Sequence, residues 1–393
     1  MFEILLFLLV GSVLGIATGL VPGFHPNLLA TLAASYVMFS PLNSSVLLVS
    51  AGVTNTFVNF IPAVYLGAPS ASTALSVLPG HKMLLQGRGY EAIRLTVVGG
   101  LVSVVIVVVL FPVLLLGIDL AYGAIEGFIP YVLLGIVGYM IWKDRRIDSL
   151  FFFMLSGLVG YIVLEYNFIG TRHDLFPPLA GLFGIPMLIH SFRKKPEIPR
   201  EDRSIRFIDR REALREGLLG SVAGMVVGLL PGVGSAQATY LTREVSDEES
   251  DRGFMVAIGG VNTSNILVSL LAIYLIGTGR SGVAVSVQNI MREVSLQETG
   301  IFVIVGLIAS GIGAYATLQL ARKSLGLFRR IDYSKVCVFV VFFISVMTLV
   351  LTGYRGILIL LVSSSIGLSC LLSGSRRSYL MGSVLLPVII FMA

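Results

Sequence analysis

Two short stretches that each contain a Pro-Gly pair carry residue types able to hold an anion. A helix that restarts after such a break presents free backbone N–H groups and the positive end of its dipole, which attract carboxylates and phosphates. We therefore predict a substrate site between the two tips. The residues of the first tip are Pro22, Gly23, Phe24, His25 and Asn27, and those of the second are Pro231, Gly232, Gly234 and Ser235.

Small polar side chains farther along the chain add a second set of candidates. Hydroxyl groups and a cation beside a helix break can contact an anion, and amide or hydroxyl oxygens can ligate a coupling ion. We expect the anion to contact Ser70, Ser72, Thr73, Arg280 and Ser281 as well. The candidates for ion coupling, with Na+ and H+ both left open, are Asn55, Thr56, Asn59, Asn262, Thr263 and Asn265.

Each of these features also has a structural interpretation. A Pro-Gly break can be a packing kink, and buried Ser, Thr and Asn side chains often only join neighbouring helices. His25 is either a proton-linked or anion-contacting group or a satisfied buried histidine. Arg280 is either an anion partner or an interfacial side chain that reaches water. The duplication of the breaks favours a functional role for them.

The elements that must position these residues occur twice. The glycines, the leucine and the Pro-Gly pair of residues 11–23 recur in residues 220–232, a shift of 209 positions. With a small change of register, the match pairs Asn55-Thr56 with Asn262-Thr263. Too few residues follow each break to cross a membrane and return as regular helices. We therefore expect a broken or re-entrant hairpin in each half.

The composition predicts an integral membrane protein. Of the 393 residues, 55% are apolar and 13% are charged, whereas a soluble domain carries about 25% charge. The net charge of +6 comes from basic residues in short segments between apolar runs, a pattern of membrane topology that argues against nucleic-acid binding. Because the chain has no Walker motif, metal-ligand pattern or Ser-His-Asp scaffold, we expect neither an enzyme nor a cofactor or metal.

Five groups of Lys and Arg set the predicted topology. They hold 22 of the 28 basic residues, and no Lys or Arg precedes Lys82. We place all five groups on the cytoplasmic side, which puts the N- and C-termini outside. The predicted spans are 95–117, 122–142, 148–165 and 175–192, followed by 301–320, 334–352, 355–373 and 379–393.

These patterns predict an all-α polytopic protein of the cytoplasmic membrane, built from two inverted-topology repeats. The first repeat covers residues 1–192, a basic cytoplasmic linker covers 193–215, and the second repeat covers 216–393. Corresponding segments then cross in opposite directions, so the two breaks meet near the midplane. Carboxylates within the spans are expected to be nearly absent, which disfavours a carboxylate proton relay.

Several motifs make the chain resemble the large membrane subunit of the tripartite tricarboxylate transporters. These motifs lie at residues 228–241 in the second half and at residues 69–75, 79–83 and 86–92 in the first. The resemblance implies a carboxylate permease that is driven by an ion gradient. It also implies two partners, a small membrane subunit and a periplasmic solute-binding protein. Beyond these, we expect contact with membrane lipid, and we leave a homodimer open.

A weaker resemblance connects the broken Gly-x-x-Pro-Gly hairpin to the polyprenyl-phosphate translocases, which return a lipid carrier to the inner leaflet. Their substrate is also an anion, and Phe24 and the apolar second tip suit its lipid tail. We predict a secondary transporter that moves a carboxylate-type organic anion by alternating access. A translocase of a polyprenyl-phosphate lipid is the alternative, and a non-transporting membrane scaffold is a third class.

Overall fold

The chain is helical almost everywhere that its structure is described. The structure is a computed structural model that describes residues 2–21, 40–67, 73, 77–125, 128, 131, 134–135, 137–138, 141–142, 147–166, 168–170, 174, 176–186, 188–189, 208–230, 235, 238–239, 242, 250–328, 333–375 and 377–392. No strand occurs among these residues, and the prediction of an all-α protein is confirmed.

The described helices cover most of the predicted spans, but the helix that contains the span 95–117 continues without interruption to Ile125, and two further long apolar helices lie at 41–65 and 251–276. Those of the first half are α1 (Phe2–Leu20), α3 (Pro41–Val58), α4 (Phe60–Tyr65), α5 (Val77–Leu85), α6 (Gly89–Ile125), α8 (Ile147–Leu164), α9 (Phe176–Leu179) and the π-helical turn η3 (Ala180–Gly184). Those of the second half are α11 (Arg210–Leu229), α13 (Asp251–Ile276), α14 (Gly282–Met291), α15 (Leu296–Phe328), α16 (Tyr333–Leu372), the 3-10 turn η4 (Arg377–Met381) and α17 (Gly382–Met392).

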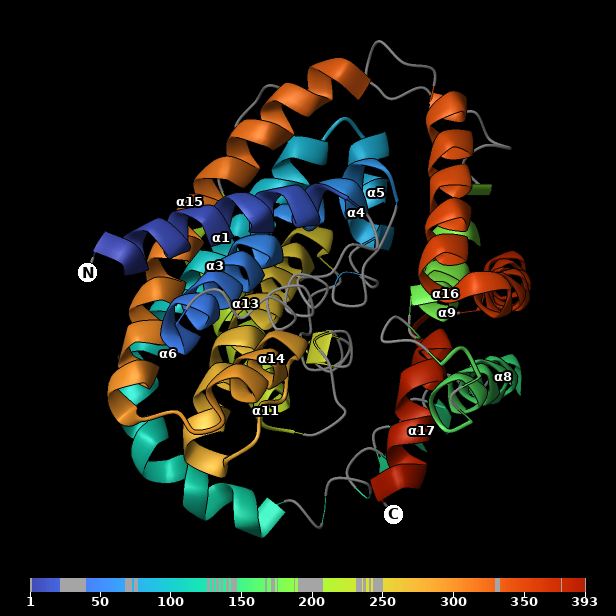
Figure 1. Ribbon diagram of the computed structural model, residues 1–393. Coiled ribbons are helices and arrows are strands. Elements are labelled where there is room, and N and C mark those ends of the chain that lie inside the picture. The colour runs from blue at the N-terminus through green and yellow to red at the C-terminus, as the bar shows by residue number, and fades with distance from the viewer. Residues whose placement is uncertain are drawn as a thin grey trace.

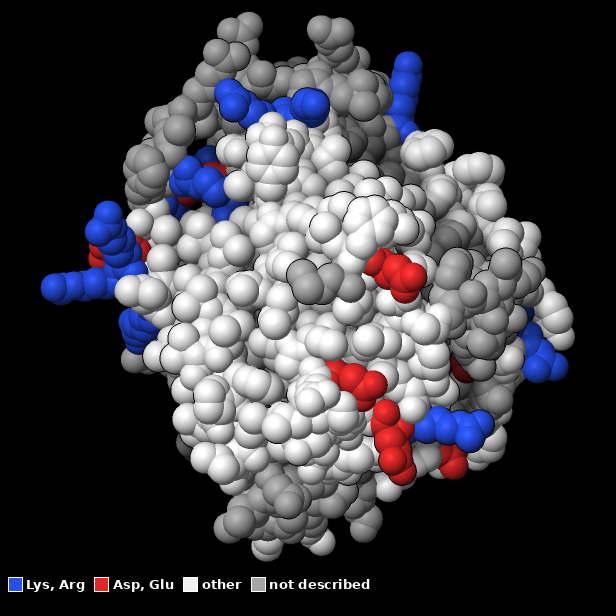
Figure 2. All heavy atoms as spheres, turned by 60° about the vertical axis from the view of Figure 1, so that its left-hand side comes forward, with Lys and Arg blue, Asp and Glu red and all other residues white. Residues whose placement is uncertain are grey.

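Seven of the described helical segments are long and apolar enough to cross a membrane. Helix α16 is broken at Gly353, which has φ 66° and ψ −163°, between the predicted spans 334–352 and 355–373. Figure 2 shows a broad, mostly uncharged face, with most of the visible Lys and Arg side chains near its edges. Such a surface suits lipid, and the prediction of a polytopic membrane protein is confirmed.

The substantial helix contacts divide the described helices into two bodies. One body contains α1, α3, α4, α5, α6, α11, α13, α14 and α15, and we call it the core body. The other contains α8, α9, η3, α16, η4 and α17, and we call it the second body. Figure 1 shows the second body to one side of the core body. Each body therefore draws helices from both halves of the sequence.

Within the core body, the main helix contacts of one half have counterparts in the other. Helix α1 packs on α3 and α15, as α11 packs on α13 and α6. Helix α3 packs on α15 and α14, as α13 packs on α6 and α5. Figure 1 shows α3 and α13 enclosed by these neighbours. The two helices that follow the Pro-Gly breaks are thus the central ones.

The duplicated glycines bring α1 against α3 and α11 against α13. A Cβ atom at Gly15 would lie 3.0 Å from the Cα of Ala51, and one at Gly224 would lie 2.5 Å from the carbonyl oxygen of Val261. Residue numbers rise together along both pairs, so each pair runs parallel. Small residues permit this close approach of two backbones. The flanking glycines that make the same kind of contact are Gly11, Gly19, Gly220 and Gly228.

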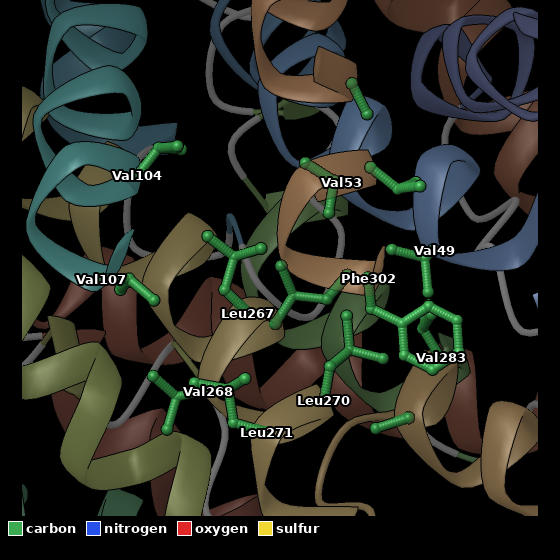
Figure 3. Close-up of a cluster of buried hydrophobic side chains, with 14 of the residues drawn as sticks. Val49, Val53, Val104, Val107, Leu267, Val268, Leu270, Leu271, Val283 and Phe302 are labelled. Atoms are coloured by element: carbon green, nitrogen blue, oxygen red, sulfur yellow. The ribbon is translucent and has the colours of Figure 1, made fainter. Parts of the chain in front are cut away.

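Helices α3 and α13 cross each other in opposite directions at the centre of the core body. A Cβ atom at Gly52 would lie 2.9 Å from Cδ1 of Ile266, whereas Thr56, one turn later in α3, lies beside Thr263, one turn earlier in α13. Figure 3 shows the apolar packing around this crossing, with side chains from α3, α6, α13, α14 and α15. Around this crossing, the contact between the halves is therefore apolar apart from the polar groups described below.

Ion pairs join the two halves at the end of the core body where α6 and α13 begin. Arg252 of α13 and Arg88 both contact the Glu91 carboxylate, over 3.0 and 2.8 Å. Lys82 of α5 contacts Asp251 over 2.6 Å. Because the side chain of Glu91 is 12% exposed, water screens its pairs less than it screens the Lys82 pair, whose lysine is 61% exposed.

We predict that Glu91→Gln lowers the unfolding temperature in detergent. The substitution removes the carboxylate that Arg88 and Arg252 share, which costs about 1–2 kcal/mol for pairs that are not fully buried. A thiol-reactive fluorophore measures the transition, because both cysteines, Cys337 and Cys370, are buried until the protein unfolds. The control is Glu298→Gln, since this carboxylate accepts only solvent-exposed hydrogen bonds from Ser295 in the hydrogen bonds seen. An equal shift in both variants would refute the prediction.

Candidate functional site

Most of the residues predicted to contact the anion lie outside the described part of the chain. These residues are Pro22, Gly23, Phe24, His25, Asn27, Ser70, Ser72, Pro231, Gly232 and Gly234. Thr73 and Ser235 are described, and they are buried with 0% and 5% of their surfaces exposed. The Thr239 hydroxyl donates to the carbonyl oxygen of Ser235 over 2.7 Å, the spacing of a helical turn. The second tip is thus followed by buried chain.

The two central helices meet through the predicted Asn-Thr pairs. The hydroxyl oxygens of Thr56 and Thr263 lie 3.5 Å apart. The Asn262 side-chain amide donates to the carbonyl oxygen of Thr56 over 3.2 Å. All three residues are at most 6% exposed. Three of the six candidates for ion coupling, drawn from both halves, therefore lie together in one buried contact.

Asn55 and Asn59 extend this polar contact toward α1. The Asn55 amide donates to the Thr18 hydroxyl over 3.2 Å, and the Asn59 amide donates to the Asn55 side-chain oxygen over 3.4 Å. Thr54 donates its hydroxyl to the Ala309 carbonyl oxygen of α15 over 3.3 Å. Thr18 and Thr54 are additions to the predicted set. Their positions in the sequence could have identified them, because Thr18 lies just before the first Pro-Gly pair and Thr54 lies just before the Asn55-Thr56 pair.

The packing corrects the register of the match between the halves. Thr54 lies against Gly15 as Ser264 lies against Gly224, a shift of 210 residues in the central helices. Asn55 then corresponds to Asn265, one turn from the Asn262 that the sequence match selected. With the same shift, the contact of Gly52 with Ile266 maps onto the observed contact of Asn262 with Thr56. The sequence match missed this because the second half has one residue more between Gly224 and Ser264 than the first half has between Gly15 and Thr54.

The structure places Arg280 and Ser281 at a different level of α13. The Arg280 and Ser281 backbone N–H groups both donate to the Ser269 hydroxyl oxygen, the first over 2.9 Å. Ser269 is two helical turns, or about 10 Å, beyond Asn262 along α13. The Ser281 hydroxyl oxygen accepts from the Ala284 backbone N–H over 3.3 Å and so caps α14. Arg280 is half-buried.

One buried carboxylate was not among the sequence candidates. Glu216 is 1% exposed, and a Cβ atom at Gly253 would lie 3.1 Å from its Cγ. It lies in α11, which begins at Arg210 and is not among the seven described helical segments that are long and apolar enough to cross a membrane. The expectation that carboxylates are nearly absent from the spans is therefore not contradicted by this residue.

The buried polar contact lies close to the meeting of the two bodies. Val261, which precedes Asn262, belongs to the same apolar cluster as Phe152 and Phe183 of the second body. At the end of α4, a Cβ atom at Gly67 would lie 3.7 Å from Leu188, which shares an apolar cluster with Ala180 and Cys337 of the second body. The bodies therefore touch beside Val261 of α13 and beside the end of α4.

The groups at this contact define what it can do chemically. Amide and hydroxyl oxygens can ligate a monovalent cation, and amide and hydroxyl hydrogens can bind a carboxylate. Neither type exchanges a proton near neutral pH. Among the described residues, no group of His, Cys, Asp and Glu is placed to hold a metal ion. The contact therefore combines the types of polar group that bind small ions in proteins.

Apolar spans around buried polar groups are typical of proteins that carry small solutes across membranes. Residues 5–382 match the Tripartite tricarboxylate transporter TctA family, and the chain belongs to that family. The chain is also similar to an uncharacterized protein of Methanocaldococcus jannaschii, with 32% identity over 401 residues that cover 98% of both chains. No solved structure matches it. The resemblance seen in the sequence motifs is confirmed.

Proposed function

We propose that this protein is a secondary transporter that moves a carboxylate-type organic anion across the cytoplasmic membrane by alternating access. The observation that carries the proposal is the buried contact of Thr56, Thr263 and Asn262, where the central helices of both halves cross. Polar groups at such a depth are costly unless they serve binding or packing. Membership of a tricarboxylate transporter family supports the binding role.

The proposed architecture is a pair of inverted repeats. Its support is that α1 and α3 are parallel, α11 and α13 are parallel, and α3 crosses α13 in the opposite direction. The 210-residue shift also maps contacts of one half onto contacts of the other. In transporters of this kind, the substrate site lies at the repeat interface. The anion site proposed here therefore lies between the two Pro-Gly tips, beside the Asn-Thr contact.

We propose that the moving parts are the core body and the second body. The substantial helix contacts fall within one body or the other, and a small interface between packed units is the usual place for relative motion. Val261 beside Asn262 and Leu66 at the end of α4 lie at this interface, so a shift of one body past the other can change which side of the membrane reaches the site. Coupling to Na+ or H+ supplies the driving force in this scheme.

The proposed orientation and partners follow from charge and family. The absence of Lys and Arg before Lys82 supports an outside N-terminus, and the basic groups support a cytoplasmic linker at 193–215. Family membership supports a solute-binding protein that delivers the anion and a small membrane subunit. Membrane lipid surrounds the apolar face, and a homodimer is one assembly to test.

The test is uptake of radiolabelled citrate into proteoliposomes that contain the protein and any small subunit and binding protein encoded beside it. We expect uptake that depends on a Na+ or proton gradient. Asn262→Ala should reduce the rate about tenfold, equivalent to about 1.4 kcal/mol, because it removes an amide from the central contact. Asn43→Ala is the matched control, since the Asn43 amide contacts Glu3 at the far end of α3.

Three outcomes would overturn the proposal. If Asn262→Ala transports as fast as Asn43→Ala, the central contact is a packing feature and the site lies elsewhere. If citrate is not taken up but a labelled polyprenyl phosphate crosses between leaflets of the same vesicles, the protein is a lipid-carrier translocase. If the protein unfolds cooperatively but shows neither activity, the result would favour a membrane scaffold.

A further inference from the structure

The loop between α13 and α14, residues 277–281, is held by a side chain from each of the two helices. On the α13 side, Ser269 accepts hydrogen bonds from two successive backbone N–H groups, those of Arg280 and Ser281. On the α14 side, the Gln288 side-chain oxygen accepts from the Gly279 N–H over 2.9 Å, and its amide donates to the Gly277 carbonyl oxygen over 2.5 Å. Four backbone groups of a five-residue loop are thus bound by two side chains.

The backbone of the loop leaves little room for another conformation. Gly277 ends α13 with φ 73°, in the left-handed region that favours glycine. A Cβ atom at Gly279 would lie 2.6 Å from the backbone of Ala284 and Val285 in α14. Glycine is required at both positions, at the first for its dihedral angle and at the second for close approach. Glycines alone would make the loop flexible, so the two polar side chains determine its shape.

Arg280 is the charged residue that this loop carries. It stands apart from the five basic groups that mark the cytoplasmic side, and it is half-buried beside the central helix. An arginine whose backbone is already fixed loses less conformational entropy when it binds a carboxylate. The separation of about two helical turns between Ser269 and Asn262 is within the combined reach of an arginine side chain and a multivalent organic anion.

We propose that Ser269 and Gln288 are positioning residues that set the Arg280 guanidinium for contact with the transported anion. The proposal rests on the proposed function for its ligand, while the loop clamp itself stands on the contacts above. Ser269 acts through the Arg280 and Ser281 backbone, and Gln288 acts through Gly277 and Gly279. Neither side chain needs to touch the anion.

The first experiment compares half-saturation concentrations for citrate uptake. Ser269→Ala should raise this concentration at least about fivefold with a smaller change in the maximal rate, because it disturbs binding before translocation. Ser269→Thr retains the hydroxyl acceptor and should restore the wild-type value. Ser264→Ala is the matched control, since this buried serine of the same helix bonds only to Gly260 and Val261 of its own helix in the contacts seen. Equal values for Ser269→Ala and Ser264→Ala would overturn the positioning role.

The second experiment measures the loop without using transport. A single cysteine replaces Arg280 in a background with Cys337→Ala and Cys370→Ala, and a membrane-impermeant thiol reagent labels it. Adding Ser269→Ala or Gln288→Ala should speed labelling several-fold, whereas adding Ser264→Ala should not. Unchanged labelling would overturn the clamp even if citrate is transported. Faster labelling in a protein that moves no citrate would keep the clamp, reject its proposed ligand, and count against the proposed function.

Discussion

A covalent bridge between the two bodies should abolish transport. We expect this for cysteines at positions 66 and 188 joined by a short thiol cross-linker, because Leu66 packs on the apolar cluster that contains Leu188 of the second body. If alternating access is a shift of the core body past the second body, then a bridge at their contact stops the cycle at one state. The measurement is citrate uptake before cross-linking, after it, and after cleavage of a reducible linker.

A bridge within the core body is the control for this experiment. Cysteines at positions 3 and 43 replace a hydrogen-bonded pair, Glu3 and Asn43, that lie 3.0 Å apart on neighbouring helices of the same body. This bridge should leave most of the uptake intact, since α1 and α3 move together. The intact mass of the protein shows whether the 66–188 bridge is closed. Full uptake by the bridged protein would contradict the proposed motion of the two bodies.

The second large effect is expected at the duplicated glycines, and it concerns folding. Gly15→Leu and Gly224→Leu should each lower the yield of folded protein severely, because even a Cβ atom meets the backbone of the parallel helix. At Gly224 that atom would lie 2.5 Å from the Val261 carbonyl oxygen. Overpacking costs typically about 1–3 kcal/mol, and more where a backbone must move. Unfolding temperature and monodispersity in detergent measure the loss.

Gly311 of α15 provides the matched control, because nothing lies within 4 Å of a Cβ atom built there. Gly311→Leu should leave the unfolding temperature unchanged or raise it slightly, since glycine is a weak helix former. The same insertion therefore gives opposite results at two membrane-helix glycines. If Gly15→Leu were as stable as Gly311→Leu, the close packing of α1 on α3 would be wrong.

Several elements of the fold could be predicted because their signals are local. The break of α16 at Gly353 falls in the short gap between two predicted spans, where the apolar run is too long for one crossing. The beginning of α11 at Arg210 did not follow from composition, because charged residues in a first helical turn look like linker residues. Hydropathy indicates whether a segment lies in lipid or in water, and it predicts the ends of membrane spans least well.

The candidate site was predictable in residue type and only in part in its geometry. The Asn-Thr pairs were recognised as a shared feature, and Thr56, Asn262 and Thr263 do lie together. Their pairing by sequence was off by one helical turn, because the second half has one residue more than the first between the duplicated glycine and the central helix contact, from Gly224 to Ser264 against Gly15 to Thr54. The contact of Ser269 with the loop at Arg280 could not be predicted either, because no sequence pattern identifies which serine accepts a hydrogen bond from a loop eleven residues away.

The sequence by itself determined that this is a helical membrane protein with a duplicated, glycine-lined break and a basic cytoplasmic linker in its predicted topology. Hydropathy, helix-breaking residues and charge placement are properties of short segments, so they can be read without knowing the neighbours. Only the tertiary structure decided that each half is divided between two bodies, and that the central helices meet at Thr56 and Thr263. Those facts depend on how closely two backbones approach, and a single added residue or a missing Cβ changes that distance.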